Sequence, residues 1–382
     1  MNKVLLTVLI IIALFWFLER RSSQTAKNAV SAPAQTQAST GNGTREPVPD
    51  YDYKGWIRKL YQEKQFKPLE EECGRLLALF RDRDDDWART SLIRLYVRLS
   101  DKQYMEEINP TNEGIKQVLD EWCQASPQSQ VPRIVRGKFM IAYAWEARGI
   151  GMANTLTPEM KKLFWERIDL AKKDLEEAYA LNPKDPYSST GLLIIKRAIG
   201  APREEMETCF RNALEADPGN YEARLQMVEA LKPKWGGSVD ALLEFARKSR
   251  EAAEKYPRAR VIVAKAHEGI QDAYICDGSD TTNEYLSKPK TWEEVSSSFQ
   301  TYLAVRPWDM WTRFDYVKFA MDAKKYDEAL QQMKEIDTYD LSGRKEPLWA
   351  LATTRVAAYL KSDPSKSAES ERYFKKAEAL AH

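Results

Sequence analysis

The chain has 382 residues, enough for two or three average domains or for one long array of repeats. Its 58 basic and 57 acidic residues give a formal net charge of +1, which argues against a nucleic-acid binder that works by neutralising phosphates. Only 16 glycines and two histidines, His267 and His382, occur in the chain. This composition argues against glycine-rich phosphate loops and against a metal site built from several histidines, so we expect no metal and no cofactor.

Residues 4–18 form an apolar run in which Thr7 is the single polar position. As a helix this run would be about 22 Å long, which is shorter than the ~30 Å hydrocarbon core of a membrane but fits a signal peptide or a signal anchor. Cleavage of a signal peptide favours small residues at positions −1 and −3. Cleavage after Ala26 or Ala29, the nearest alanines, would leave no small residue at position −3. The sequence therefore predicts an uncleaved membrane anchor over residues 1–21.

Basic residues lie on both sides of the apolar run, so charge alone does not decide its orientation. Because an N-terminal apolar run usually acts as an export signal, we expect a single-pass protein with its body on the extracytoplasmic side.

Residues 22–50 are rich in Ser, Thr, Ala, Gln, Pro and Gly and contain no aromatic residue, Leu, Ile or Met. Such a segment buries too little apolar surface to offset the entropy of ordering it. The composition predicts a disordered tether, with a root-mean-square span on the order of 30 Å.

From residue 51 to residue 382 the pattern is helical. Fifteen of the 18 prolines fall here, mostly between apolar-periodic runs of helical length. Thr157 before Pro158 predicts a helix start, and Thr291 three residues before Glu294 predicts a capping box. No part shows sustained alternation typical of strands, so we expect an all-α body.

Three segments of the body share one spacing: a large apolar residue, a second packing residue three positions on, and a proline five positions further. This spacing resembles the second helix of a tetratricopeptide repeat, and it is clearest over residues 171–341, with an insertion at residues 277–290. The resemblance implies a tetratricopeptide-like α-solenoid of stacked helical hairpins with a groove. The three segments are Leu175, Ala178 and Pro183; Phe210, Ala213 and Pro218; and Phe299, Tyr302 and Pro307.

Two short strings, residues 144–151 and 231–238, resemble the bacterial family named domain of unknown function 4034. The resemblance covers roughly residues 53–339 and implies a tetratricopeptide-like protein of the bacterial envelope without an assigned reaction. In such a cell, the apolar run at residues 4–18 would lie in the cytoplasmic (inner) membrane. The residues that carry it are Trp145, Arg148 and Gly149 in the first string and Trp235, Gly236 and Gly237 in the second.

Each string has two interpretations. In the second string, the first interpretation is that Gly236 and Gly237 permit a tight turn and that Trp235 fills the hydrophobic junction beside it. The second is that Trp235 forms a recognition platform at the edge of the groove. In the first string, Arg148 stacks on Trp145 or pairs with an acid, or it contributes to an anion site.

In tetratricopeptide repeats the first helix of each pair lines the groove. This register nominates two sets of partner-binding residues, and their aromatic members fit the core equally well. The Asn/Lys pattern with which such repeats grip a C-terminal carboxylate is not visible, so we expect the groove to hold an extended or amphipathic apolar peptide. The residues are Tyr187, Thr190 and Arg197 in one helix and Trp311, Phe314 and Lys318 in another.

The sequence offers no catalytic constellation. His267 stands alone in a helical context, and we expect it to be a packed or surface residue. The acidic run at Asp82, Asp84 and Asp86 lacks the glycine and the final glutamate of a calcium loop. The four cysteines form no CxxC pair, which leaves either buried thiols or one or two long-range disulfides. They are Cys73, Cys123, Cys209 and Cys276.

The leading hypothesis is a non-enzymatic, membrane-anchored scaffold that binds a protein or peptide partner and no nucleic acid, with its oligomeric state open. Two alternatives are an envelope hydrolase acting on cell-wall material and a glycan-binding module. The hydrolase would need carboxylates with separated pKa values, and the glycan-binding module is suggested by ten tryptophans in the body.

Overall fold

The computed structural model describes residues 51–83, 86–105, 107–149, 155–279, 284–339, 341 and 347–381. These residues form sixteen α-helices and no strand, which confirms the all-α prediction for this part of the chain. Within the same residues, no helix combines the length and the apolar character needed to cross a membrane. The expected anchor at residues 4–18 and the expected tether at residues 22–50 lie outside the described residues.

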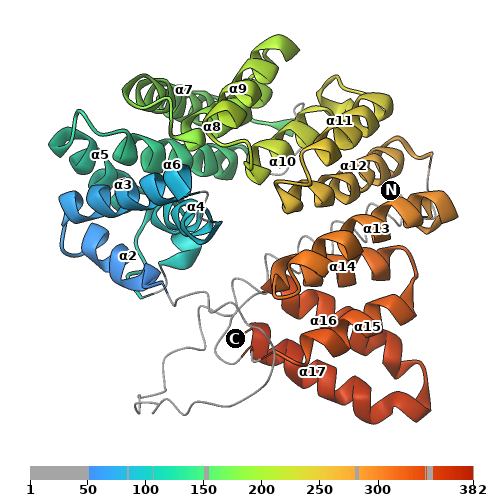
Figure 1. The fold of residues 1–382 in the computed structure, drawn as a ribbon. Helices are drawn as coiled ribbons and strands as arrows, with labels where there is room; N and C mark the ends of the chain where they lie inside the picture. Colours follow the sequence, from blue (N-terminus) through green and yellow to red (C-terminus); the bar gives the residue numbers. More distant parts are fainter. Residues whose placement is uncertain are drawn as a thin grey trace, which may run out of the picture. The chain divides into compact units, whose positions relative to one another are not determined.

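The chain divides into two compact units, one spanning Pro47–Gly269 and the other containing Ile270–His382. The division falls inside helix α12, Ile262–Asp277. Each unit is built from helices joined by short turns (Figure 1).

The described residues of the first unit form ten complete α-helices and three complete 3-10 turns. They are α2 (Tyr53–Tyr61), α3 (Phe66–Arg83), α4 (Asp86–Ser100), η1 (Lys102–Tyr104), α5 (Asn112–Ala125), α6 (Gln130–Arg148), α7 (Pro158–Leu181), α8 (Pro186–Ala198), α9 (Arg203–Ala216), α10 (Tyr221–Ala230), η3 (Pro233–Trp235), α11 (Val239–Glu251) and η4 (Pro257–Val261).

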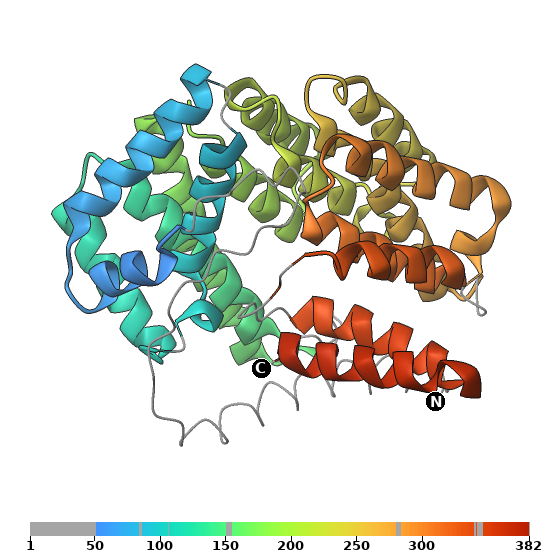
Figure 2. The same ribbon diagram turned by 60° about the horizontal axis from the view of Figure 1, so that its bottom comes forward.

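The second unit continues from α12 and ends with two long antiparallel helices, which lie side by side in Figure 2. The connection from Asp277 to Pro289 contains a 3-10 turn whose Tyr285 and Leu286 are buried. The elements after α12 are η5 (Tyr285–Ser287), α13 (Pro289–Val305), α14 (Met310–Asp322), α15 (Tyr326–Ile336), α16 (Pro347–Lys361), η6 (Pro364–Lys366) and α17 (Ser367–Ala381).

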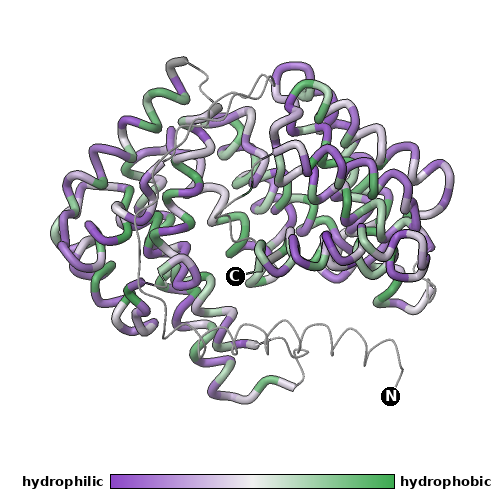
Figure 3. The backbone as a smooth tube through the Cα atoms, turned by 90° about the horizontal axis from the view of Figure 1, so that it is seen from below, coloured by the Kyte–Doolittle hydropathy of each residue, from purple (hydrophilic) through white to green (hydrophobic). Residues whose placement is uncertain are grey.

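Helices α6, α8 and α10 pack side by side in succession. Helices α7 and α9 each pack on the two helices that flank them in the chain, which is the packing of stacked helical hairpins. Hydrophobic and hydrophilic residues alternate along the helices (Figure 3), as expected when each helix buries one face.

The turns after α7, α9 and α13 share one capping pattern. Pro183, Pro218 and Pro307 each follow the end of the helix, as the sequence spacing predicts. Two residues after each proline, a side-chain oxygen accepts a hydrogen bond from a backbone N–H in the first turn of the next helix. The acceptors are Asp185 for Tyr187, Asn220 for Ala223 and Asp309 for Thr312.

Two predicted helix starts have different outcomes. Thr157 caps α7 through the backbone N–H of Met160, as predicted. The capping box at Thr291 is wrong, because α13 begins two residues earlier at Pro289. Proline suits the first helical position, since its missing N–H needs no acceptor there.

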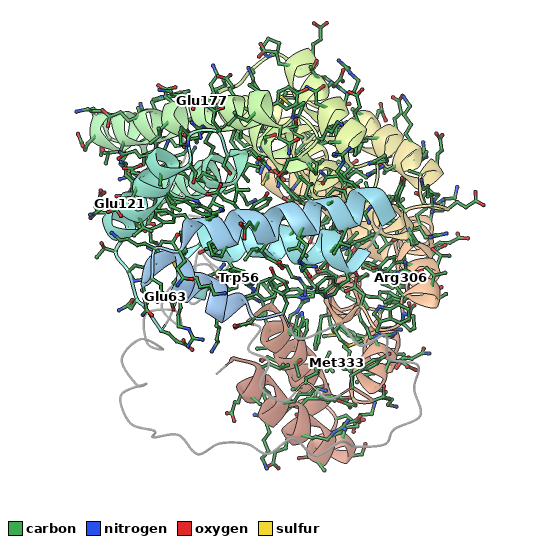
Figure 4. All side chains as sticks on the ribbon, turned by 60° about the vertical axis from the view of Figure 1, so that its left-hand side comes forward. Trp56, Glu63, Glu121, Glu177, Arg306 and Met333 are labelled. Atoms are coloured by element: carbon green, nitrogen blue, oxygen red, sulfur yellow. The ribbon has the colours of Figure 1, made fainter. Side chains whose placement is uncertain are left out.

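The first unit also contains the helix pair α3 and α4, of which α4 is hydrogen-bonded to the turns after α7 and α9. Helices α3 and α4 lie side by side in the foreground of Figure 4. The hydroxyl of Tyr96 on α4 donates to Asp185 at 2.7 Å, and Arg89 Nε donates to Asp217 at 3.2 Å. Helix α4 is therefore bound to the turns of two successive hairpins.

The four cysteines are free thiols. Cys73, Cys123 and Cys209 are buried and Cys276 is exposed. The expectation of long-range disulfides is therefore wrong for this structure, and the expectation of four buried thiols is wrong at Cys276.

Candidate functional site

Two of the predicted groove residues on α8 belong to the core. The ring of Tyr187 packs edge-on against Tyr96 of α4, with centroids 5.3 Å apart, and only 3% of Tyr187 is exposed. Thr190 is buried too; its hydroxyl donates to the Pro186 carbonyl and accepts from Asn220. Because α4 and α10 cover these positions, they offer no surface to a partner.

Arg197, the third predicted residue on α8, lies two turns further along and is half-buried. Its Nη1 donates to the side-chain oxygen of Gln226 at 2.9 Å and more weakly to the Gln226 carbonyl. Its Nε is buried without a hydrogen-bond acceptor. Burial lowers the pKa of Arg197, against the opposing effect of Glu229 and Glu222. A guanidinium in this state has unused donor capacity.

The string around Trp235 supplies the next part of the same site. The centroid of the Trp235 ring lies 5.7 Å from the Arg197 Cζ, within the range of a cation–π contact. Trp235 is half-buried, and its Nε1 donates to Glu229 at 3.2 Å. The structure thus brings together two residues that the sequence nominated separately, one as a groove residue and one as a family-motif residue.

The turn that places Trp235 requires both glycines. Gly236 has a φ of 84°, in the left-handed region. A Cβ on Gly237 would lie 1.9 Å from the backbone oxygen of Leu231, closer than real atoms approach. The prediction of a tight, glycine-dependent turn is confirmed, while the Trp235 side chain is directed to Arg197 and Glu229.

Glu229 is held ionised beside this turn. Lys232 and Lys234 each approach its carboxylate to 2.7 Å. Burial alone would raise the pKa of Glu229, but the hydrogen bonds from the two lysines outweigh it and lower the pKa to about 2. Both lysines are therefore occupied by Glu229.

Lys138 of α6 is a cation without such a partner. It is half-buried, and its ammonium group makes no hydrogen bond or ion pair with any described residue. Burial lowers the pKa of Lys138, and the charge of Glu222 on α10 partly offsets this effect. Glu222 in turn accepts from the Gln226 amide at 2.7 Å.

We call this group the Arg197 site. It is contributed by α6, α8, α10 and the η3 turn, and it combines unpaired cations with an aromatic ring. Sequence reasoning missed Lys138, Glu222 and Gln226, and no local pattern around these residues marks them as part of a site. The site consists of Lys138, Arg197, Glu222, Gln226, Glu229 and Trp235.

The predicted residues on α14 pack against α16 in the second unit. Phe314 is buried, and its ring stacks on Trp349 with centroids 4.6 Å apart. The half-buried Trp311 meets Trp349 edge-on at 5.0 Å. Lys318, also half-buried, binds Asp322 at 3.0 Å. The sequence left open whether the nominated aromatic residues line the groove or belong to the core, and Phe314 belongs to the core.

The string at the end of α6 has a structural explanation. The Arg148 Cζ lies 5.2 Å from the centroid of the Trp145 ring, which confirms the stacked arrangement. Gly149 ends the helix with a φ of 68°, and its N–H donates to the Trp145 carbonyl. Arg133 on the same helix binds Glu177, which Figure 4 places on α7.

The described residues contain no group of three or more His, Cys, Asp or Glu side chains arranged to hold a metal ion. His267 is buried, as expected for a packed histidine. Of the ten tryptophans in the body, Trp165 alone is as much as 46% exposed, and the others are half-buried or buried. The coplanar exposed pair that a glycan-binding module would favour is not formed by these residues.

The fold is that of an all-helical, repeat-like protein. Residues 54–204 match the family model described as Domain of unknown function (DUF4034), and over this range the chain resembles that family. The matched range contains the string at residues 144–151 and ends before the string at residues 231–238. No curated protein matches the chain.

Proposed function

We propose that the chain is a non-enzymatic scaffold that binds a protein or peptide partner at the Arg197 site. The observation that carries the proposal is that two half-buried cations, Lys138 and Arg197, form no salt bridge with any described carboxylate, and that the Arg197 Nε has no hydrogen-bond acceptor. Charged groups removed from water are normally paired, because unpaired burial is costly. A partner group that satisfies these donors would gain binding energy from them.

We also propose that the helical hairpins form tetratricopeptide-like solenoid units. The repeated proline spacing, the shared capping pattern after α7, α9 and α13, and the succession of α6, α8 and α10 support this assignment. Because Tyr96 of α4 covers Tyr187, a binding surface on α8 would lie toward the end of the helix that carries Arg197.

The membrane location is a proposal from the sequence. The apolar run at residues 4–18 would anchor the chain in the cytoplasmic membrane, with the body on the extracytoplasmic side. A flexible tether would then raise the local concentration of the scaffold near membrane-bound partners, so that a weak site suffices.

Crosslinking in native membranes tests the scaffold proposal. The full chain and its Arg197→Gln variant are expressed at equal levels, and crosslinked partners are identified by mass spectrometry. Lys162→Gln is the matched control, because Lys162 lies on α7 and is 66% exposed. We expect one partner set to be lost with Arg197→Gln and retained with Lys162→Gln. Identical capture by all three chains would contradict the proposal.

Deletion of residues 1–21 tests the anchor independently of the site. The truncated chain should move from the membrane to the soluble fraction, and retention in the membrane would show the anchor assignment to be wrong. A reporter that is active only outside the cytoplasm, fused to the C-terminus, should be active; an inactive reporter would reverse the proposed orientation.

A further inference from the structure

We propose that the outward side of helix α2 binds a membrane surface that carries anionic phospholipid headgroups. The surface, which we call the α2 face, is formed by α2 and by residues of α4, which packs beside it. The inference rests on the proposed membrane location and adds an electrostatic contact of the body to it, independent of the Arg197 site. The α2 face consists of Lys54, Trp56, Arg58, Lys59, Arg94 and Arg98.

Helix α2 presents basic side chains on its outward side. Lys54 and Arg58 lie four positions apart, and therefore on the same side of the helix. Both are exposed, and 75% of the Lys54 side chain is accessible. Lys59 is half-buried, and the helix contains no acidic residue. The residues that pack toward the rest of the unit are Gly55, Ile57, Leu60 and Tyr61.

Helix α4 adds two arginines beside α2. The Arg98 Cζ lies 4.8 Å from the centroid of the Tyr53 ring, which belongs to α2. Burial raises the pKa of Tyr53, and the charges of Arg94 and Arg98 oppose this effect, so both guanidinium groups lie near its hydroxyl. Lys54, Arg58, Lys59 and these two arginines give the α2 face five cations.

The carboxylates next to the α2 face are too few to neutralise it. Glu107 binds Lys54 at 2.8 Å, and Asp52 caps α2 by accepting from the backbone N–H of Gly55. Glu72, which also attracts Lys59, is bound by Arg75 at 2.7 Å. Even when Glu63, just after the helix, is added to Asp52 and Glu107, five cations face three carboxylates. The excess positive charge complements an anionic surface.

Two aromatic side chains accompany these cations. Trp56, which marks α2 in Figure 4, is half-buried, and the Lys59 Nζ lies 4.1 Å from the centroid of its ring. Tyr53 is half-buried as well. Trp and Tyr are enriched at membrane–water interfaces, because their rings are apolar and carry a polar group. The α2 face therefore combines both kinds of side chain that suit a headgroup region.

The position of α2 in the chain favours a membrane over other anionic partners. Residues 22–50, the proposed tether, lead from the apolar run at residues 4–18 to this helix. A flexible coil of that length spans on the order of 30 Å, so the proposed anchor keeps α2 close to the bilayer. At such a local concentration a few cations suffice for contact. A nucleic acid or an acidic protein is under no such constraint.

Acetylation of lysines in the full chain tests the inference. The chain is reconstituted in two sets of nanodiscs, one of phosphatidylcholine alone and one of equal parts phosphatidylcholine and phosphatidylglycerol. It is labelled briefly with an amine-reactive acetylating reagent, and mass spectrometry gives the rate at each lysine. Lys54 reports on the α2 face. Lys162 on α7 is the internal reference, because its side chain is 66% exposed.

We expect Lys54 to react about tenfold or more slowly in the discs that contain phosphatidylglycerol, and Lys162 to react equally in both. Added salt should remove the protection, because it screens the attraction. The double variant Arg58→Gln with Lys59→Gln should lose the protection of Lys54. The matched control removes two exposed cations from α7, by Lys161→Gln with Lys173→Gln, and should keep it.

Equal Lys54 rates in the two discs would overturn the inference, as would protection that the Arg58 and Lys59 double variant retains. Equal slowing of Lys162 would also overturn it, because the contact would not be specific to the α2 face. Protection of Lys54 in native membranes but in neither disc would assign the face to an acidic macromolecule instead. Circular dichroism melts confirm that each variant keeps its fold.

The anchor proposal and this inference fail in different ways. A chain that enters the discs but shows no protection of Lys54 keeps the anchor and contradicts the α2 contact. A chain that enters neither disc contradicts the anchor. In that case the same labelling, with vesicles of the two lipid compositions added to the chain in solution, still tests the α2 face.

Discussion

Leu175 of α7 packs directly onto the backbone of α6 at Gly137. A Cβ placed on Gly137 would lie 2.8 Å from the Cγ of Leu175, and a Cβ on Gly191 of α8 would meet the same side chain at 2.7 Å. Leu175 is fully buried. One leucine therefore joins three successive helices, and it can do so because two of them lack a side chain at the contact.

This contact predicts that Gly137→Ala destabilises the protein despite the higher helix propensity of alanine. Overpacking of this kind costs about 1–3 kcal/mol. Gly74→Ala is the matched control, since a Cβ on Gly74 of α3 would meet nothing within 4 Å; we expect it to stabilise the chain by about 0.5–1 kcal/mol. Denaturant unfolding measures both changes.

The double variant Gly137→Ala with Leu175→Ala provides the internal check. Leu175→Ala alone should cost about 2–5 kcal/mol through the cavity it leaves. If the two side chains compete for one space, the double variant loses less than the sum of the single losses. If the two single losses of unfolding free energy simply add in the double variant, the contact between Gly137 and Leu175 is not the cause of the loss in Gly137→Ala.

Asp185 predicts a specific dependence of stability on pH. Burial raises the pKa of Asp185 to about 6, although hydrogen bonds from Tyr96 and the Tyr187 N–H favour the ionised form. The folded state therefore binds the proton more tightly than the unfolded state, so stability from this group is present below about pH 4 and is lost as pH rises through about 6. The full difference is about 3 kcal/mol.

Asp185→Asn removes this ionisation while keeping an acceptor for the helix cap, as Asn220 does in the next turn. We expect the variant to be more stable than the unmodified chain at pH 7.5 and the advantage to shrink between pH 6 and pH 4. Thermal unfolding at several pH values measures the difference. An advantage that stays constant over this range would contradict the raised pKa.

Local sequence patterns predicted the parts of the fold that depend on local interactions. The spacing of Pro183 and Pro218 marked two helix ends, and Gly236 marked a turn, because each reflects a backbone preference of that residue. Tyr187 was assigned to the groove because its position in the repeat faces that side. Tyr96, which covers it, lies 91 positions earlier in the chain, and no local pattern reveals such a contact.

The candidate site shows the same limit. Arg197 and Trp235 were each nominated from sequence, but their contact depends on the turn at Gly237, which α10 and Leu231 position. Lys138 and Glu222 come from helices two apart in the stack. Their electrostatic interaction arises from the packing of α6, α8 and α10 rather than from any motif.

The cysteines predict one reactive thiol in the native protein. Cys276 is exposed, whereas burial raises the pKa of Cys123 to about 12 and also raises the pKa of Cys73 and Cys209. Thiolate is the reactive form, so the buried thiols react slowly. Maleimide labelling without reductant should give one label per native chain and four after denaturation, and Cys276→Ser should give none in the native state. Fewer than four labels after denaturation would indicate a disulfide.

The pair Phe314 and Trp349 predicts where the second unit is most sensitive to substitution. Phe314 is 3% exposed and stacked on Trp349 with an interplanar angle of 13°, so Phe314→Ala leaves a cavity and removes an aromatic pair. We expect a loss of about 3–5 kcal/mol and a smaller loss for the half-buried Trp311. Leu351→Ala on α16 is the control, because Leu351 is 46% exposed and such surface changes stay within about 0.5 kcal/mol.

Hydrogen exchange measured by mass spectrometry on peptides from α14 and α16 reports this loss within the second unit itself. Phe314→Ala should accelerate exchange in both helices, because its ring connects them, and Leu351→Ala should leave α14 unchanged. If Phe314→Ala leaves exchange in α14 and α16 at the level of the unmodified chain, the ring does not stabilise the pair.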